Sequence, residues 1–154
     1  MESAVRSKRP SRYWRSEAKA TILIVDDNHE DKYFLVWALK TLDLNHSITV
    51  LSSGDEVIAY LSGKPPFHDR TRCPIPQLML LDLKMPKVDG FEVLQWIKTQ
   101  AVLDGFNVVV FSASNRDSDI AKAKELGAKD YIIKPVDTLD LVDAVREVTF
   151  RWLN

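Results

Sequence analysis

Short apolar runs alternate along the chain with longer segments in which apolar residues recur every three or four positions. The short runs are rich in Ile, Val and Leu, as is typical of strands buried on both faces; they cover residues 21–25, 47–51, 78–81, 108–111 and 131–133. The longer segments have helical spacing; they cover residues 30–42, a stretch that starts at 56, and residues 89–99, 117–126 and 139–152. The pattern predicts five strands that alternate with five helices.

This alternation predicts an α/β fold in which helices cover both faces of a parallel sheet. The longest connection, residues 62–76, contains four of the seven prolines and is expected to be a surface loop. His68 and Cys73 lie in this loop. Two ligands are too few for a metal site, so we expect both to be ordinary loop residues. Gly127 follows the helix at 117–126 and is typical of a helix C-cap.

Charge is distributed unevenly along the 154 residues, a length that suits one compact domain. The chain has 21 basic and 22 acidic residues. Residues 1–19 contain six basic and two acidic side chains, a net charge of +4, which leaves −5 for the remainder. We expect a flexible tail over 1–19 and a domain over 20–154. Alternatively, residues 13–15 contact a partner or nucleic acid through stacking side chains, although the acidic body argues against nucleic acid as the main ligand.

The apolar runs are too short to cross a membrane, and no apolar segment follows the basic residues at the start of the chain, as a signal peptide would require. Cys73 is the single cysteine, which excludes an internal disulfide and a thiolate metal cluster. These features predict a cytoplasmic protein that does not bind membranes.

Polar side chains follow four of the predicted strands at the point where each strand ends. Asp26 and Asp27 follow the first strand, Asp82 the third, Ser112 the fourth and Lys134 the fifth. Ligands bind outside the carboxyl ends of strands in an open parallel sheet, so we expect these residues to converge. Grouped carboxylates favour Mg²⁺. A metal, a lysine and a hydroxyl around one aspartate suit phosphoryl transfer, in which the aspartate can be the nucleophile.

Other chemistries lack the sequence features that they need. The first strand is followed by Asp27-Asn28-His29-Glu30 rather than by a glycine-rich phosphate loop. Ser112 has no flanking glycines of a nucleophile elbow. A dinucleotide-binding protein, a Walker-type nucleotidase and a serine hydrolase are therefore disfavoured.

The chain resembles the receiver domain of two-component response regulators over residues 20–150. The resemblance rests on four motifs in order, namely Ile24-Val25-Asp26-Asp27, the segment Leu81-Asp82-Leu83-Lys84-Met85-Pro86-Lys87-Val88-Asp89-Gly90, Phe111-Ser112-Ala113 and Lys134-Pro135. It implies a flavodoxin-like sheet with the strand order 2-1-3-4-5. It also implies a signalling domain rather than an enzyme, limited to self-phosphorylation from small donors and autodephosphorylation.

The resemblance further implies a phosphoacceptor and a Mg²⁺ site. Asp82 would accept a phosphoryl group from a phosphohistidine of a sensor histidine kinase. Asp82 and Asp27 would bind Mg²⁺ directly, Asp26 would help through water, and the backbone carbonyl of Lys84 would be a further ligand.

The remaining motif residues are implied to sense the phosphoryl group. Lys134 would pair with it, Ser112 would turn toward it, and Tyr131 would change rotamer as Ser112 moves. The Lys134-Pro135 bond resembles the family's cis peptide bond.

Two features depart from the common pattern of the family. Lys84 stands two residues after the acceptor, where many relatives have an uncharged residue, and its charge could screen the phosphoryl group or hinder an attacking water. The loop at 62–76 is longer than in minimal receivers and resembles that of stand-alone receivers partnered with bacterial phytochromes.

The chain ends at Asn154, directly after the last predicted helix, so we expect no direct DNA binding and an output through protein contacts. The expected partners are a sensor histidine kinase, a downstream protein and a second copy, through the fourth helix, fifth strand and fifth helix. Two alternatives stay open: a pseudo-receiver that binds partners without phosphorylation, which Lys84 permits, and a Mg²⁺-dependent phosphohydrolase, for which the loop at 62–76 is small and polar.

Overall fold

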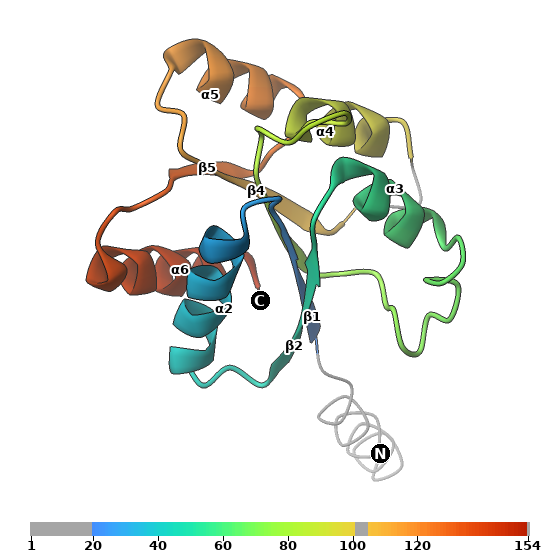
Figure 1. Cartoon of the computed structure of the whole chain (residues 1–154), viewed down its shortest axis with the longest axis horizontal. Coiled ribbons are helices and arrows are strands. Elements are labelled where there is room, and N and C mark those ends of the chain that lie inside the picture. Colours follow the sequence, from blue (N-terminus) through green and yellow to red (C-terminus); the bar gives the residue numbers. More distant parts are fainter. Residues whose placement is uncertain (1–19, 101–104, 154) are drawn as a thin grey trace, which may run out of the picture.

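The computed structural model describes residues 20–100 and 105–153, in which five strands alternate with five helices (Figure 1). The strands are β1 (Ala20–Val25), β2 (His46–Leu51), β3 (Leu78–Leu81), β4 (Asn107–Ser112) and β5 (Asp130–Ile133). The helices are α2 (His29–Thr41), α3 (Gly54–Ser62), α4 (Gly90–Lys98), α5 (Asp117–Glu125) and α6 (Thr138–Trp152). The predicted elements are confirmed with small differences at their ends. The tail predicted at 1–19 lies outside the described residues.

The five strands form one parallel sheet in the order β2-β1-β3-β4-β5. The fold class and the strand order expected from the sequence are therefore confirmed. All strands point the same way, so their carboxyl ends lie at one edge of the sheet. This edge carries the polar residues on which the functional argument depends.

The sheet separates two apolar layers. Leu23, Val25, Met79 and Leu81 belong to the layer covered by α3, α4 and α5. The alternate residues, such as Ile24, pack in the layer covered by α2 and α6 (Figure 1). Side chains alternate between the two faces of a strand, so a strand covered on both faces must be apolar at every position. Burial of each large side chain contributes about 1.5–3 kcal/mol to stability, which fixes the strand register.

Four of the five helices begin with a polar side chain that caps their first turn, whereas α5 follows Arg116, which forms no side-chain cap. Asn28, Ser53 and Asp137 accept a hydrogen bond from the first turn of α2, α3 and α6. Asp89 caps α4 and forms a reciprocal capping box with Glu92. Gly127 follows α5 with a φ of 106°, as expected for a residue at the end of a helix.

Three details differ from the expectations. The helical spacing of residues 30–42 predicts a buried apolar face, but Trp37 and Phe34 in this helix are 41% and 38% exposed, so α6 and the sheet do not cover its whole apolar width. The described residues contain one cis peptide bond, Pro65-Pro66, so the expected cis bond before Pro135 is wrong.

Among the described residues, no helix combines the length and apolarity that a bilayer crossing requires.

The loop between α3 and β3 is held to the body of the protein by Arg70. Its guanidinium donates hydrogen bonds to the carbonyls of Tyr60, Leu61 and Cys73 at 2.8–3.0 Å. The Tyr60 hydroxyl donates to the Pro74 carbonyl at 2.8 Å, and Cys73 packs against the core. The loop is thus an ordered cover on the end of α3, and Cys73 and His68 do not belong to a group of possible metal ligands among the described residues.

We expect Arg70→Met to lower the free energy of unfolding by about 2 kcal/mol, because three backbone carbonyls lose a charged donor. Urea denaturation measures this loss, and limited proteolysis should show faster cleavage within residues 62–76. Arg72→Met is the matched control, because Arg72 is an exposed arginine of the same loop. Equal losses in the two variants would contradict the anchoring role of Arg70.

Candidate phosphoacceptor site

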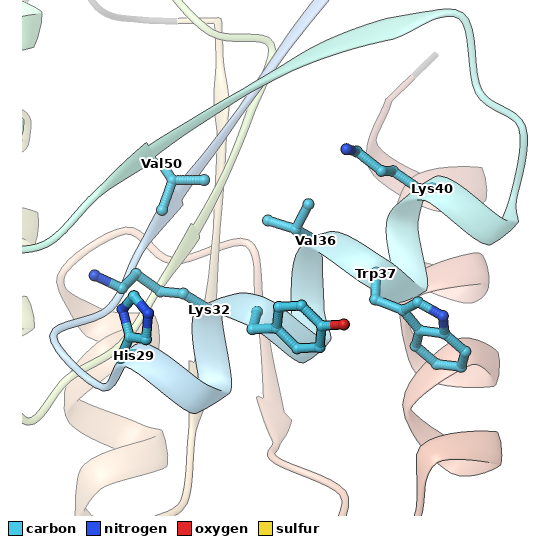
Figure 2. Close-up of a pocket in the computed structure, with 7 residues that line it drawn as sticks. His29, Lys32, Val36, Trp37, Lys40 and Val50 are labelled. Carbon is cyan, nitrogen blue, oxygen red and sulfur yellow. The ribbon is translucent and has the colours of Figure 1, made fainter.

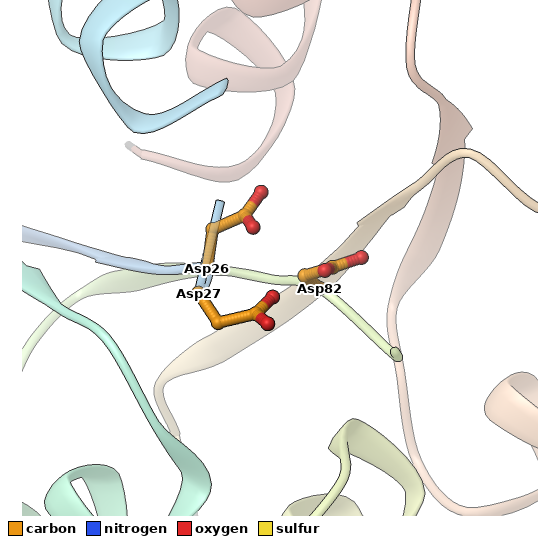
Figure 3. A group of neighbouring side chains, drawn as sticks. All are labelled: Asp26, Asp27 and Asp82. Atoms are coloured by element: carbon orange, nitrogen blue, oxygen red, sulfur yellow. The ribbon is translucent and has the colours of Figure 1, made fainter. Parts of the chain in front are cut away.

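Three carboxylates meet where β1 and β3 end (Figure 3). Asp26, Asp27 and Asp82 each offer an oxygen, and these oxygens lie within 4.8 Å of one another. Asp26 and Asp82 are 2% and 5% exposed, whereas Asp27 faces solvent. Three oxygen donors at this spacing, one of them open to water, fit a hard divalent cation such as Mg²⁺. The predicted convergence of these three residues is confirmed.

Lys134 supplies the positive charge that faces this cluster. Its ammonium lies 2.7 Å from Oδ2 of Asp26, 2.9 Å from Oδ2 of Asp31 and 3.6 Å from Oδ1 of Asp82. Burial lowers the pKa of Lys134, but the hydrogen bonds to Asp26 and Asp31 and the charge of Asp82 outweigh it, so that the pKa lies above its usual value. Lys134 is therefore a permanent cation.

Asp82 is the least compensated of the buried carboxylates. Burial is the main cause that raises its pKa to about 6, and the charge of Asp26 adds to it. The charge of Lys134 and a hydrogen bond from the backbone N–H of Lys84 act in the opposite direction. Asp26, in contrast, accepts from both Lys134 and the Asn28 backbone N–H. An added cation would therefore stabilise mainly the negative charge of Asp82.

The backbone around Asp82 is fixed by a close approach of α4. A Cβ on Gly90 would lie 2.4 Å from the carbonyl oxygen of Asp82, a distance that real Cβ atoms do not adopt. The N–H of Gly90 donates to the Leu83 carbonyl at 2.9 Å. Gly90 therefore allows the start of α4 to press against the chain that carries Asp82.

Ser112 and Tyr131 do not belong to this cluster. The hydroxyl of Ser112, at the end of β4, is fully buried and accepts a hydrogen bond from the Ser114 N–H at 3.2 Å. The Tyr131 hydroxyl donates to the Ser114 carbonyl at 2.9 Å. Both residues thus converge on one loop, and neither lines the groove above Asp82. Their roles as sensors of a phosphoryl group remain predictions, as does the role of the Lys84 carbonyl.

A groove of about 440 Å³ opens over Asp82 and Asp27. Its rim includes Lys84, Ser114 and Arg116. Another hollow, of about 520 Å³, lies between α2 and β2 (Figure 2). The hollow at α2 and β2 is lined by Trp37, Val50 and other residues, none of which carries a carboxylate, so it is separate from the acidic cluster.

Asp31 is a further site residue that the sequence motifs did not indicate. It lies in the first turn of α2 and shares the ammonium of Lys134 with Asp26. The available signal was its position five residues after Asp26, because the helix that follows a parallel strand starts at the same edge of the sheet. A helix start also favours an acidic residue for its own sake, so this signal alone does not distinguish a capping residue from a site residue.

The pKa of Asp82 predicts how the stability of the metal-free protein depends on pH. The folded-state pKa of about 6 lies above the ordinary value of 3.8, so folding favours the protonated form, and stability is lost as the pH rises between these values. Asn cannot ionise. In EDTA, Asp82→Asn should therefore match the wild type near pH 4 and exceed it by on the order of 2–3 kcal/mol at pH 8.

Urea denaturation of both proteins between pH 4 and pH 8 measures this difference, and titrating groups remote from Asp82 cancel in the comparison. Added Mg²⁺ should reduce or reverse it at pH 8, because a cation bound to the folded wild type stabilises that protein. A difference that is constant over this pH range would show that Asp82 titrates in the ordinary way.

Comparison with known proteins identifies the family. Residues 22–146 match the family model for the response regulator receiver domain. The chain is 35% identical over 133 residues to the probable methanogenesis regulatory protein FilR2 of Methanothrix harundinacea, covering 86% of this chain and 83% of that protein. It is 33% identical over 139 residues to response regulator Rcp1 of Synechocystis sp., covering 90% and 92% of the two chains.

Solved structures agree with these relatives. The phosphorylated cyanobacterial phytochrome response regulator RcpA superposes with a TM-score of 0.80 at 33% identity, covering 88% of this chain and 95% of that one. The Mn²⁺-bound form of Rcp1 gives a TM-score of 0.78 at 32% identity and the same coverage. With the sheet order, the acidic cluster and the lysine in place, this chain belongs to the response regulator receiver domain family.

Proposed function

We propose that the protein is a response regulator that accepts a phosphoryl group on Asp82 from a phosphohistidine of a sensor histidine kinase. The observation that carries the proposal is the buried carboxylate of Asp82, whose charge is only partly balanced. Asp26 and Asp27 lie beside it, and the Lys134 ammonium lies 3.6 Å from its Oδ1. Such a site suits phosphoryl transfer, because catalysis of this reaction consists mostly of positioning and of charge stabilisation.

In the transfer, an Oδ atom of Asp82 attacks phosphorus while the P–N bond of the donor breaks. The electron pair of that bond returns to the imidazole nitrogen, which takes up a proton from solvent. Asp26, Asp27 and Asp82 would hold Mg²⁺, with the Lys84 carbonyl as a further ligand. When bound, Mg²⁺ would neutralise part of the charge on the phosphoryl oxygens. Lys134 is already fixed within reach of an oxygen of Asp82 and supplies a second positive charge.

The signal would pass through the loop that joins β4 to α5. A phosphoryl group on Asp82 introduces new acceptor oxygens beside Ser112, whose hydroxyl is held by the same loop residue, Ser114, as the hydroxyl of Tyr131. A turn of Ser112 toward those oxygens would release one of these restraints and leave Tyr131 free to change rotamer. The change would appear on the surface formed by α5, β5 and α6.

This surface is the proposed contact for a downstream protein or a second copy. Ile133 in β5 and Leu139 in α6 are 46% and 73% exposed, and Phe150 near the end of α6 is 79% exposed. Exposed apolar side chains at a surface that changes with phosphorylation would allow a partner to bind one state more tightly than the other.

Two other functions use parts of the same site. A pseudo-receiver would need no phosphorylation, but the three carboxylates and Lys134 form a complete constellation. A Mg²⁺-dependent phosphohydrolase would need to hold an external substrate. The loop at 62–76 is anchored by Arg70 at α3 and does not contribute to the groove above Asp82. The observations therefore favour the receiver.

Incubation with acetyl phosphate and Mg²⁺ should add one phosphoryl group to the wild type, as measured by intact mass. Phosphoramidate, a small donor with the P–N bond of phosphohistidine, should give the same product. We expect no addition to Asp82→Asn or in EDTA, because the first lacks the nucleophile and the second lacks the cation. Asp117→Asn, which removes an exposed carboxylate of α5, should still be modified.

The same reaction distinguishes the alternatives. A protein that stays unmodified under conditions in which another receiver is phosphorylated would be a pseudo-receiver. Release of many equivalents of inorganic phosphate per protein each minute, with Asp82 as nucleophile, would indicate a phosphohydrolase. A slow release that follows the decay of the single adduct is the expected result.

A further inference from the structure

A second groove adjoins the one above Asp82, and two cationic side chains lie between them. The second groove has a volume of about 520 Å³ and runs between the chain after β3 and the start of α5. Lys84 and Arg116 line both grooves, whereas Asp119 lines only the second. Each of the two cations is exposed and long enough to serve either groove.

Asp119 is a negative charge in the second groove, whereas Asp82 lies in the first. Its side chain is 13% exposed, and one oxygen accepts a hydrogen bond from the Ser114 hydroxyl at 2.6 Å. The Arg116 Nε lies 4.0 Å from the same oxygen. The hydrogen bond from Ser114 is the main cause that holds the pKa of Asp119 low against the effect of burial, and the charges of Arg116 and Lys84 contribute. Asp119 is therefore ionised at neutral pH.

We propose that Asp119 is a positioning residue whose charge draws Lys84 and Arg116 toward the second groove, and that both cations turn to the phosphoryl group once Asp82 is modified. This inference rests on the proposed function. A phosphoryl group brings a charge of about −2 and three acceptor oxygens to the first groove, where it competes with the single charge of Asp119 for the same two side chains. The balance between the two anions then sets how long the phosphorylated form lasts.

The reaction that ends this form is hydrolysis. A water oxygen attacks phosphorus on the side opposite the Asp82 oxygen, the P–O bond to Asp82 breaks, and Asp82 leaves with the electron pair as a carboxylate. Both protons of the water remain on the released dihydrogen phosphate. The water must reach phosphorus through the groove above Asp82. Lys84 and Arg116 line this groove, so these side chains obstruct the attack when they pair with the phosphoryl oxygens.

Removal of the Asp119 charge should therefore lengthen the life of the phosphorylated form. We expect Asp119→Asn to increase the half-life about threefold, and Arg116→Gln to shorten it by a similar factor, as befits exposed charge interactions. The protein is loaded with acetyl phosphate and Mg²⁺, the donor is removed, and the phosphorylated fraction is followed by intact mass. Asp119→Glu should restore the wild-type half-life, because it keeps the charge.

Asp117→Asn is the matched control, because Asp117 is also an acidic residue in the first turn of α5 but does not line either groove. A double-mutant cycle tests the mechanism. Asp119→Asn should have no effect on the half-life in a Lys84→Met, Arg116→Gln background, since the cations that it controls are gone. A merely structural effect of Asp119 would persist in that background.

Three results would overturn the inference: an unchanged half-life in Asp119→Asn, an equal change in Asp117→Asn, or an effect of Asp119→Asn that persists without the two cations. Each of them leaves phosphorylation of Asp82 intact and so does not affect the proposed function. A wild-type protein that accepts no phosphoryl group would instead remove the proposed function, and this inference with it.

Discussion

The site depends on one electrostatic constraint: two buried carboxylates share one ammonium and do not share it equally. Lys134 lies 2.7 Å from Asp26 but 3.6 Å from Asp82, and Asp26 also receives a backbone N–H. Close carboxylates removed from water repel each other, and burial together with the charge of Asp26 raises the pKa of Asp82 to about 6. Asp82 is therefore the carboxylate that an additional positive charge stabilises most. The same property supports the proposal that Asp82 combines a cation with a phosphoryl group.

The repulsion between Asp26 and Asp82 persists because the surrounding fold prevents their backbone segments from moving apart. Asp26 and Asp82 follow neighbouring strands whose side chains are buried on both faces, so a shift of register would expose a whole set of Leu and Ile side chains. The close approach of Gly90 to the Asp82 carbonyl prevents the chain after β3 from moving toward α4. The apolar layers thus supply the free energy that holds like charges together. The unfavourable free energy of this repulsion is offset by burial of the apolar core.

The sequence predicted the parts of this arrangement that follow from backbone geometry. Strand ends in a parallel sheet share an edge, so the convergence of Asp26, Asp27 and Asp82 required only correct strand assignments. The partners of individual side chains were harder to predict from the sequence. That Lys134 also binds Asp31 depends on rotamers and on the angle at which α2 leaves the sheet. The exposure of Trp37 does not follow from the sequence, because helical spacing identifies an apolar stripe but not how much of its width the neighbouring elements cover.

The same distinction applies to the loop between β4 and α5, where the family motif ends at Ala113 and the sequence gives little guidance. In the structure, Ser114 is the residue that joins the parts: its N–H binds Ser112, its carbonyl binds Tyr131 and its hydroxyl binds Asp119. Phosphorylation can shift a conformational equilibrium only through interactions that differ between the two states. A single residue hydrogen-bonded to the hydroxyls of Ser112 and Tyr131 and to the first turn of α5 would supply such a difference, because a change at any one of these contacts alters the restraint on the other two.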